Sequence, residues 1–231
     1  MAKTVLQSIG RYHFLKVAAF LCLFYLCPLV YAHAQEPQYD YVTTLKLNGI
    51  ELSHEKSFFS YDRMQAVFGK DGVITRAESN ECTANFDLSV NYPKKNIAVG
   101  LEYFPEENPD FDKTEKFSLK NPNKAFLPAK GRLSADWRNM RSFSQKLQVG
   151  SLTVSPDLTF STFKKHFPTS AKSPAYFGND KTYIVYFISP PELKKQKNKP
   201  QFDDPAYNRH VKFGFRNGKL DELSIFQGIA C

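Results

Sequence analysis

An apolar segment near the amino terminus indicates the cellular compartment in which this chain folds. Residues 17–34 form an apolar run that follows three cations, is interrupted by Pro28 and ends in small residues. This layout is typical of a secretory signal peptide with cleavage after Ala34. The sequence therefore predicts that residues 1–34 are removed and that residues 35–231 fold outside the cytoplasm, in the periplasm or as a secreted protein.

A membrane anchor and a lipoprotein signal are the two alternatives for this segment. A membrane anchor needs about 20 apolar residues, whereas residues 17–31 supply fifteen and include Pro28. A bacterial lipoprotein needs a small residue before the acylated cysteine, but Cys22 and Cys27 each follow a leucine. We therefore expect no stable membrane span after signal cleavage.

Cysteine usage fits an oxidising compartment. Cys82 and Cys231 are the cysteines that remain after cleavage, and two cysteines in such a compartment most simply form one disulfide bond. A free or intermolecular thiol is the alternative. The remaining histidines, His54, His166 and His210, are far apart and lack metal-ligand spacing. We expect neither a metal nor a cofactor.

The net charge of the chain indicates which kinds of partner its surface suits. Removing the three cations of the signal lowers the formal net charge from +8 to +5. A mildly basic surface suits a cell wall, a membrane surface or an acidic partner, and it also serves solubility alone. Nucleic acid is disfavoured as a partner because the chain is exported.

Alternation of apolar and polar residues predicts a sheet-rich first half. Strands are expected at 41–47, 82–92 and 96–104. Between the first two, Ser60 has the properties of a helix N-cap and Gly69 those of a helix stop. The pattern predicts a helix of about two turns between these two residues.

The second half shows a similar pattern. A strand-like stretch at 142–154 precedes a helix that we expect to start at Ser155 and to end before Pro168. A strong strand at 181–189 and a hairpin over 209–226 follow. Trp137, the single tryptophan, is either a buried anchor or an interface residue.

The two halves resemble one another. Residues 47–69 and 148–168 share the order strand, glycine-containing turn, short helix and terminal Gly or Pro. This predicts an internal repeat, with chance similarity as the alternative. The expected fold is α+β, with two tandem modules at 35–135 and 136–231, each a short helix packed on a small antiparallel sheet. Residues 121–132 are interpreted as a linker or a long excursion.

This order resembles the tandem modules of beta-lactamase-inhibitor proteins and the single module of small outer-membrane assembly lipoproteins. The resemblance covers about residues 47–104 and 148–227, and the helix ends "MQAVFG" and "FKKHFP" carry it. Members of these families are mostly binders or assembly factors. The resemblance therefore implies a binding function, by analogy of fold.

Catalytic signatures are missing from the sequence. It contains no nucleophile elbow, HExxH, paired Cys-x-x-Cys, phosphate loop or dinucleotide loop. We therefore expect a protein that is not an enzyme, with dispersed catalytic residues as the alternative.

Two charged loops are the candidate partner-binding sites. The acidic loop contains Glu106, Glu107, Asp110 and Asp112. The basic loop contains Lys194, Lys195, Lys197 and Lys199. Either loop can face an oppositely charged partner, and the alternative for each is an exposed, solvated connector. For the acidic loop, a Ca²⁺ site is a further alternative, although the loop lacks a loop-defining glycine.

The combined hypothesis is an exported envelope binding protein that occludes a protein partner. Its sharpest form is an immunity or inhibitor protein against a periplasm-targeting toxin or hydrolase. An envelope-assembly or peptidoglycan-associated module is the second hypothesis, and an enzyme is the third.

Overall fold

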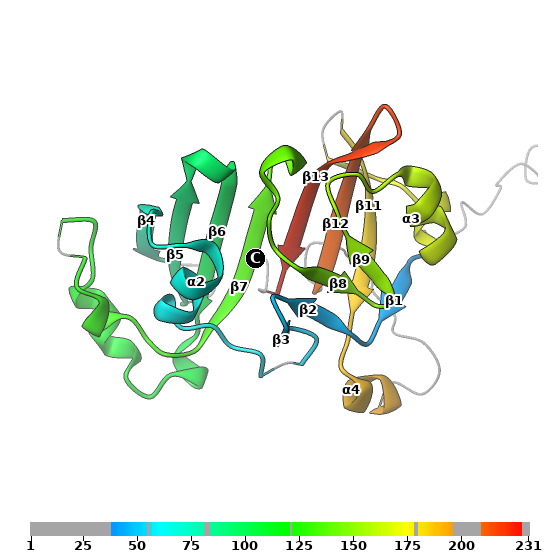
Figure 1. Cartoon of the computed structure of the whole chain (residues 1–231). Helices are drawn as coiled ribbons and strands as arrows, with labels where there is room; N and C mark the ends of the chain where they lie inside the picture. Colours follow the sequence, from blue (N-terminus) through cyan, green and yellow to red (C-terminus); the bar gives the residue numbers. More distant parts are fainter. Residues whose placement is uncertain are drawn as a thin grey trace, which may run out of the picture. The chain divides into compact units, whose positions relative to one another are not determined.

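The computed structural model describes residues 38–54, 56–80, 84–120, 122–177, 180–195 and 209–227, and it is mainly β structure (Figure 1). The larger sheet has nine strands: β1 (Asp40–Val42), β4 (Val73–Ser79), β5 (Phe86–Tyr92), β6 (Ile97–Tyr103), β7 (Gly131–Trp137), β10 (Ala175–Phe177), β11 (Asp180–Phe187), β12 (His210–Arg216) and β13 (Lys219–Phe226). The smaller sheet has four: β2 (Leu45–Leu47), β3 (Ile50–Glu51), β8 (Leu147–Val149) and β9 (Leu152–Val154). In the described residues, the α-helices are α2 (Tyr61–Phe68), α3 (Phe160–His166) and α4 (Pro190–Lys195).

The nine-stranded sheet is continuous across both halves of the chain. Its order is β1-β11-β12-β13-β7-β6-β5-β4, and β10 also pairs with β11. All pairs are antiparallel except β1 with β11, which is parallel. The two halves meet where β7 pairs with β13, from Trp137 opposite Leu223 to Ser134 opposite Phe226.

The predicted fold of two tandem helix-on-sheet modules is therefore wrong. Pairing of β7 with β13 places the strands of both halves in one mixed sheet, and β2 pairs with β8 in the smaller sheet. The expected boundary between 135 and 136 falls inside β7. The chain does show the same order of elements twice, a hairpin, a helix and four strands, but these strands do not form two separate sheets.

The core lies on one face of the nine-stranded sheet. The buried side chains of β5, β6, β7, β11, β12 and β13 form a single hydrophobic cluster with those of α2, α3 and the smaller sheet. In Figure 1, α2 lies over β5 and β6, and α3 lies beside β11 and β12. Phe68 of α2 contacts Trp137 with ring centroids 6.0 Å apart, and Phe163 of α3 contacts Phe213 at 5.0 Å.

Trp137 is a buried anchor. Its side chain is fully buried, and its indole N–H donates to Gln145 Oε1 over 3.1 Å. The ring of Phe143 packs edge-on against it at 5.5 Å. This resolves the choice that the sequence leaves open for the single tryptophan.

Helix α2 follows the sequence prediction. The Ser60 hydroxyl accepts a hydrogen bond from the backbone N–H of Arg63 over 3.2 Å, which is N-cap geometry. Gly69 ends the helix at a φ of +107°, a conformation that favours glycine. The Lys95 ammonium donates to the carbonyl of Phe68 and so caps the last turn.

Helix α3 begins later than predicted, and its N-cap is Thr159 rather than Ser155. The backbone just before the helix is engaged by the start of β13. Leu220 donates to the carbonyl of Leu158 over 2.8 Å, and Phe160 donates to the carbonyl of Gly218 over 2.9 Å. These bonds hold the chain extended at Thr159, so the helix starts after it.

Other predicted features lie outside the described residues. These are the signal segment at 1–34 and the cysteines of the predicted disulfide, Cys82 and Cys231. Among the residues that the structure describes, no helix has the length and apolar character needed to cross a membrane.

Candidate binding face of the nine-stranded sheet

The face of the nine-stranded sheet that points away from the core is referred to below as the outer face. Strand pairing aligns one row of outer-face residues across eight strands, and the neighbours in this row are Arg76, Ser89, Gly100, Ser134, Phe226, His210, Tyr186 and Tyr41. The middle of the row is built from small residues and one end from aromatic ones. Because of this difference in size, the outer face is lower over the small residues than over the aromatic ones.

The outer face has an open groove of about 380 Å³. Its floor consists of short side chains from four neighbouring strands: Ser89, Ala98, Gly100, Ser134 and Ser224. Because a β-sheet surface is otherwise covered by side chains, a cluster of short residues leaves a depression there. The floor is rich in hydroxyl groups.

Gly100 leaves room for the Ser134 hydroxyl as it lies in this structure. A Cβ atom at position 100 would collide with Ser134 Oγ. The hydroxyl of Ser134 therefore leans over the backbone of β6, where a larger residue would project. The neighbours Val99 and Leu101 are buried in the core. Strand β6 is therefore anchored by its core-facing side chains, and at Gly100 it has no side chain on the outer face.

Asp136 supplies a carboxylate at the end of the groove. The Ser224 hydroxyl donates to Asp136 Oδ1 over 2.7 Å, across the β7–β13 junction. Arg138 approaches Asp136 Oδ2 at 3.5 Å, and its own side chain is 74% exposed. The Ser224 hydroxyl therefore holds one carboxylate oxygen of Asp136, and the other oxygen has the exposed Arg138 guanidinium as its neighbour.

An aromatic wall closes the other side of the groove. The rings of His210 and Phe226 are 5.5 Å apart, and Tyr186 packs edge-on against His210 at 6.3 Å. Tyr39 in turn packs edge-on against Tyr186 at 5.4 Å. Tyr186 is fully buried and His210 is 8% exposed, so at the groove itself Phe226 is the partly exposed ring of this wall, supported by rigid aromatic packing behind it. Lys212 adds a basic group to the same wall.

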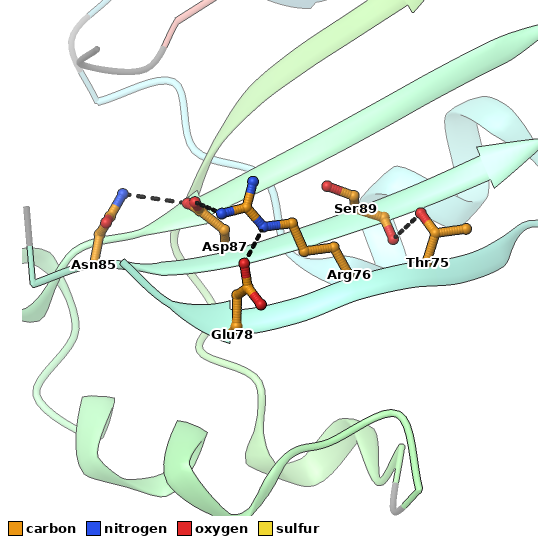
Figure 2. A network of polar contacts seen from close by, with 6 residues as sticks. All are labelled: Thr75, Arg76, Glu78, Asn85, Asp87 and Ser89. Carbon is orange, nitrogen blue, oxygen red and sulfur yellow. Dashed lines mark hydrogen bonds and ion pairs between the residues drawn. The ribbon is translucent and has the colours of Figure 1, made fainter. Parts of the chain in front are cut away.

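A charged network lies beside the groove, on β4 and β5 (Figure 2). Arg76 Nε is 2.7 Å from Glu78 Oε1, and Arg76 Nη2 is 3.7 Å from Asp87 Oδ2. Asn85, which is fully buried, donates to Asp87 Oδ1 over 3.3 Å and also to Glu102. Figure 2 shows Arg76 between the two carboxylates.

Burial raises the pKa of Asp87 above its ordinary value. The charge of Arg76 and a hydrogen bond from Asn80 act in the opposite direction, and Glu78 adds to the rise. The upward direction shows that the single guanidinium does not fully offset the loss of water around this carboxylate.

The four acidic residues predicted as partner contacts lie between β6 and β7. They are Glu106, Glu107, Asp110 and Asp112. Two of them form ion pairs within the chain, since Arg132 contacts Glu107 at 2.6 Å and Lys113 contacts Asp110 at 2.8 Å. Glu106 and Asp112 are exposed. A role for this loop in partner binding stays a prediction.

The predicted basic loop is described in part. Lys194 is exposed in α4, and Lys195 is the last residue of that helix. Lys197 and Lys199 lie outside the described residues. The structure therefore places one ammonium group of the predicted set on the surface.

The three histidines that the structure describes have separate surroundings. His54 is exposed, and His166 Nδ1 is 3.1 Å from the Ser151 hydroxyl at an exposed position. His210 belongs to the aromatic wall of the groove. Across the described part of the chain, no group of three or more His, Cys, Asp or Glu side chains could hold a metal ion.

The sequence shows the short residues of the groove floor but not that they lie side by side. Ser134 stands between Leu133 and Ala135 in an alternating stretch, and Gly100 follows Val99 in another. Alternation identifies the outward residues once the strand is known. That the outward residues of four different strands are all short becomes visible when the pairing is known.

Comparison of the chain with known protein families, with characterised proteins and with solved structures finds no match. No relative supplies a function by similarity. The argument for function therefore rests on the outer face and on the chemistry of the residues that form it.

Proposed function

We propose that this protein is an exported binding protein of the bacterial envelope that occludes a protein partner. In the sharpest form of the proposal, the outer-face groove receives a loop of a toxin or hydrolase directed at the periplasm. The signal-like segment at 17–34 supports export. The groove between Ser89 and the aromatic wall is the observation that carries the binding function.

The frame beneath the groove is suited to binding without large rearrangement. The groove spans strands β5, β6, β7, β13 and β12, all of which are interior strands of the sheet and are paired on both sides. The opposite face of these strands is packed in the core. A preformed surface loses little conformational freedom on association, and this favours affinity.

The chemistry of the groove is that of a protein-recognition surface. The serine hydroxyls of the floor can donate to or accept from the peptide groups of an inserted loop. The partly exposed ring of Phe226, packed against the buried His210, offers an apolar wall, and Asp136 and Lys212 offer charges of both signs. Aromatic anchors combined with adaptable hydroxyl groups are common in binding surfaces.

The test is to fill the groove. Ala98→Trp and Ser134→Trp place a large side chain on the floor, and Thr153→Trp makes the same kind of change at an exposed position of the smaller sheet. Envelope extracts and secreted effectors of the same cell are passed over each immobilised protein. Mass spectrometry then quantifies the bound material. We expect one protein that the wild type and Thr153→Trp retain and that both groove variants lose.

A further variant separates the groove from the acidic loop. Glu106→Lys together with Asp112→Lys reverses the charge of two exposed acidic residues between β6 and β7 for which no ion pair within the chain is seen in the described residues. Capture that survives groove filling and is lost on this charge reversal would place the binding site on the loop. Absence of any stoichiometric protein would contradict occlusion and favour the assembly or wall-associated hypothesis.

A further inference from the structure

Strand β4 is an edge of the nine-stranded sheet. It ends the strand order, and in the described part of the chain it pairs with β5 alone. Five of its seven residues are exposed, and Val73 retains 56% of its accessible surface. An edge of this length presents a row of backbone donors and acceptors that can pair with another strand.

The regular part of this edge runs from Arg76 to Ser79. These residues pair one to one with β5, whereas the register shifts between Ile74 and Arg76. A bulge of this kind bends the beginning of a strand away from its neighbours. The segment that follows the bulge is therefore the part that can take up a further strand.

The charges on this segment select one way of pairing the strand with itself. Arg76 and Glu78 both point to the outer face, because they pair with Ser89 and Asp87 of β5. Antiparallel self-pairing centred on Arg76 or on Glu78 would place like charges opposite each other, which is destabilising. Pairing centred on Ala77 instead places each Arg76 opposite Glu78 of the other copy.

We propose that β4 pairs antiparallel with β4 of a second copy of this chain, centred on Ala77. Residues directly opposite in an antiparallel pair project from the same face. The outer faces of the two copies therefore adjoin, and both grooves open on the same side of the dimer. The proposal concerns an edge that does not line the groove, so it stands independently of the proposed function.

The charged pair is accessible for this contact. The side chains of Arg76 and Glu78 are 50% and 59% exposed. Within one chain they already form an ion pair at 2.7 Å, and self-pairing adds the same interaction twice across the junction. Since one short edge buries little surface, we expect a weak and reversible dimer.

The test is the dependence of mass on concentration, measured by sedimentation equilibrium on the protein as purified from cells. For the wild type, we expect the average mass to rise from one chain toward two between the micromolar and millimolar ranges. Glu78→Arg and Arg76→Glu each set like charges opposite each other and abolish this rise. The double exchange, Arg76→Glu with Glu78→Arg, restores opposite charges and restores the rise.

Asp157→Arg is the control, because it makes the same charge change as Glu78→Arg at an exposed position before α3. It should associate like the wild type. Circular dichroism and melting temperature show whether each variant is folded, and hydrogen exchange of the β4 amides should slow at high concentration. A wild type that stays monomeric up to millimolar concentration overturns the proposal, as does a dimer that persists in both single variants.

Discussion

Trp137 of β7 lies directly opposite Leu223 of β13, and both side chains are fully buried. On its other side, Trp137 lies opposite Ile97 of β6. The largest side chain in the protein thus stands in the strand where the two halves of the chain are joined. Its packing couples the first half to the second, so the stability of the sheet depends on this position.

We predict that Trp137→Ala destabilises the protein by about 3–5 kcal/mol, because it removes a large buried side chain and leaves a cavity. The Gln145 side chain also loses its hydrogen bond from the indole. Chemical denaturation measures the free energy of unfolding. Trp137→Phe keeps most of the buried volume and should cost clearly less. A near-neutral Trp137→Ala would contradict the role of this side chain at the junction.

The error in the predicted fold has its origin in β7. Residues 121–132 contain Asn, Pro, Lys and Gly, a composition that predicts a linker or a long excursion. The alternation of Leu133, Ala135 and Trp137 with polar residues is the strand signal that follows. Without this strand, the two halves have no shared partner and are predicted to be separate. Strand pairing between distant segments is not encoded in local periodicity, since it depends on which edges are left open.

Local structure was more predictable than its assembly. The α2 cap at Ser60 and the β12–β13 hairpin follow from short-range physics, and both are confirmed. The sequence does not predict strand β4, because Arg76, Glu78 and Ser79 give it the composition of a loop and an edge strand needs little apolar surface. The groove could not be predicted, because Gly100 and Ser134 are brought together by pairing across strands that the sequence does not specify.

We predict that the protein loses stability in acid because the Glu51 carboxylate becomes protonated. Burial acts to raise the pKa of this carboxyl, but hydrogen bonds from the Ser53 hydroxyl and from the backbone N–H groups of Leu45 and Ser53, together with the charge of Lys46, outweigh burial and lower it. A lowered pKa in the folded state gives stability that is present above the ordinary pKa of glutamate. This stability is lost as the pH falls through the lowered value.

The variant Glu51→Gln tests this pH-dependent contribution of Glu51 to stability. The stability of the wild type minus that of the variant should be largest near neutral pH. It should shrink as the pH falls below the ordinary range of a glutamate, because the wild-type carboxyl becomes protonated. Urea denaturation at a series of pH values gives both curves. Parallel curves at all pH values would show that these hydrogen bonds do not favour the ionised form.

The Asp87 carboxyl should have the opposite effect on how the stability of the protein depends on pH. Its pKa is raised, chiefly by burial, so the folded protein binds this proton more readily than the unfolded chain does. The free-energy cost of burying the ionised carboxylate applies in full at neutral pH. It is relieved as the pH falls through the raised pKa, because the carboxyl then takes up a proton. Asp87→Asn removes this cost, and we expect it to be neutral or stabilising at neutral pH.

The comparison of Asp87→Asn with the wild type must be made over the same pH series. The advantage of the variant should disappear on acidification, which is the reverse of the behaviour expected for Glu51→Gln. Asn85 keeps its position by donating to Glu102 as well. A variant that is clearly destabilised at neutral pH would mean that the ion pair of Asp87 with Arg76 outweighs the burial of the carboxylate.

Gly100 and Ser134 should be coupled, and a double-mutant cycle can measure this. Glycine inside a strand normally costs stability, so Gly→Ala at such a position gains about 0.5–1 kcal/mol where there is room. At position 100 the added methyl group meets the Ser134 hydroxyl, which must rotate away. We expect Gly100→Ala to be neutral or destabilising in the wild type and stabilising in the Ser134→Ala background. The same sign in both backgrounds would show that Ser134 does not lean over Gly100, and the floor of the groove would then have a different shape.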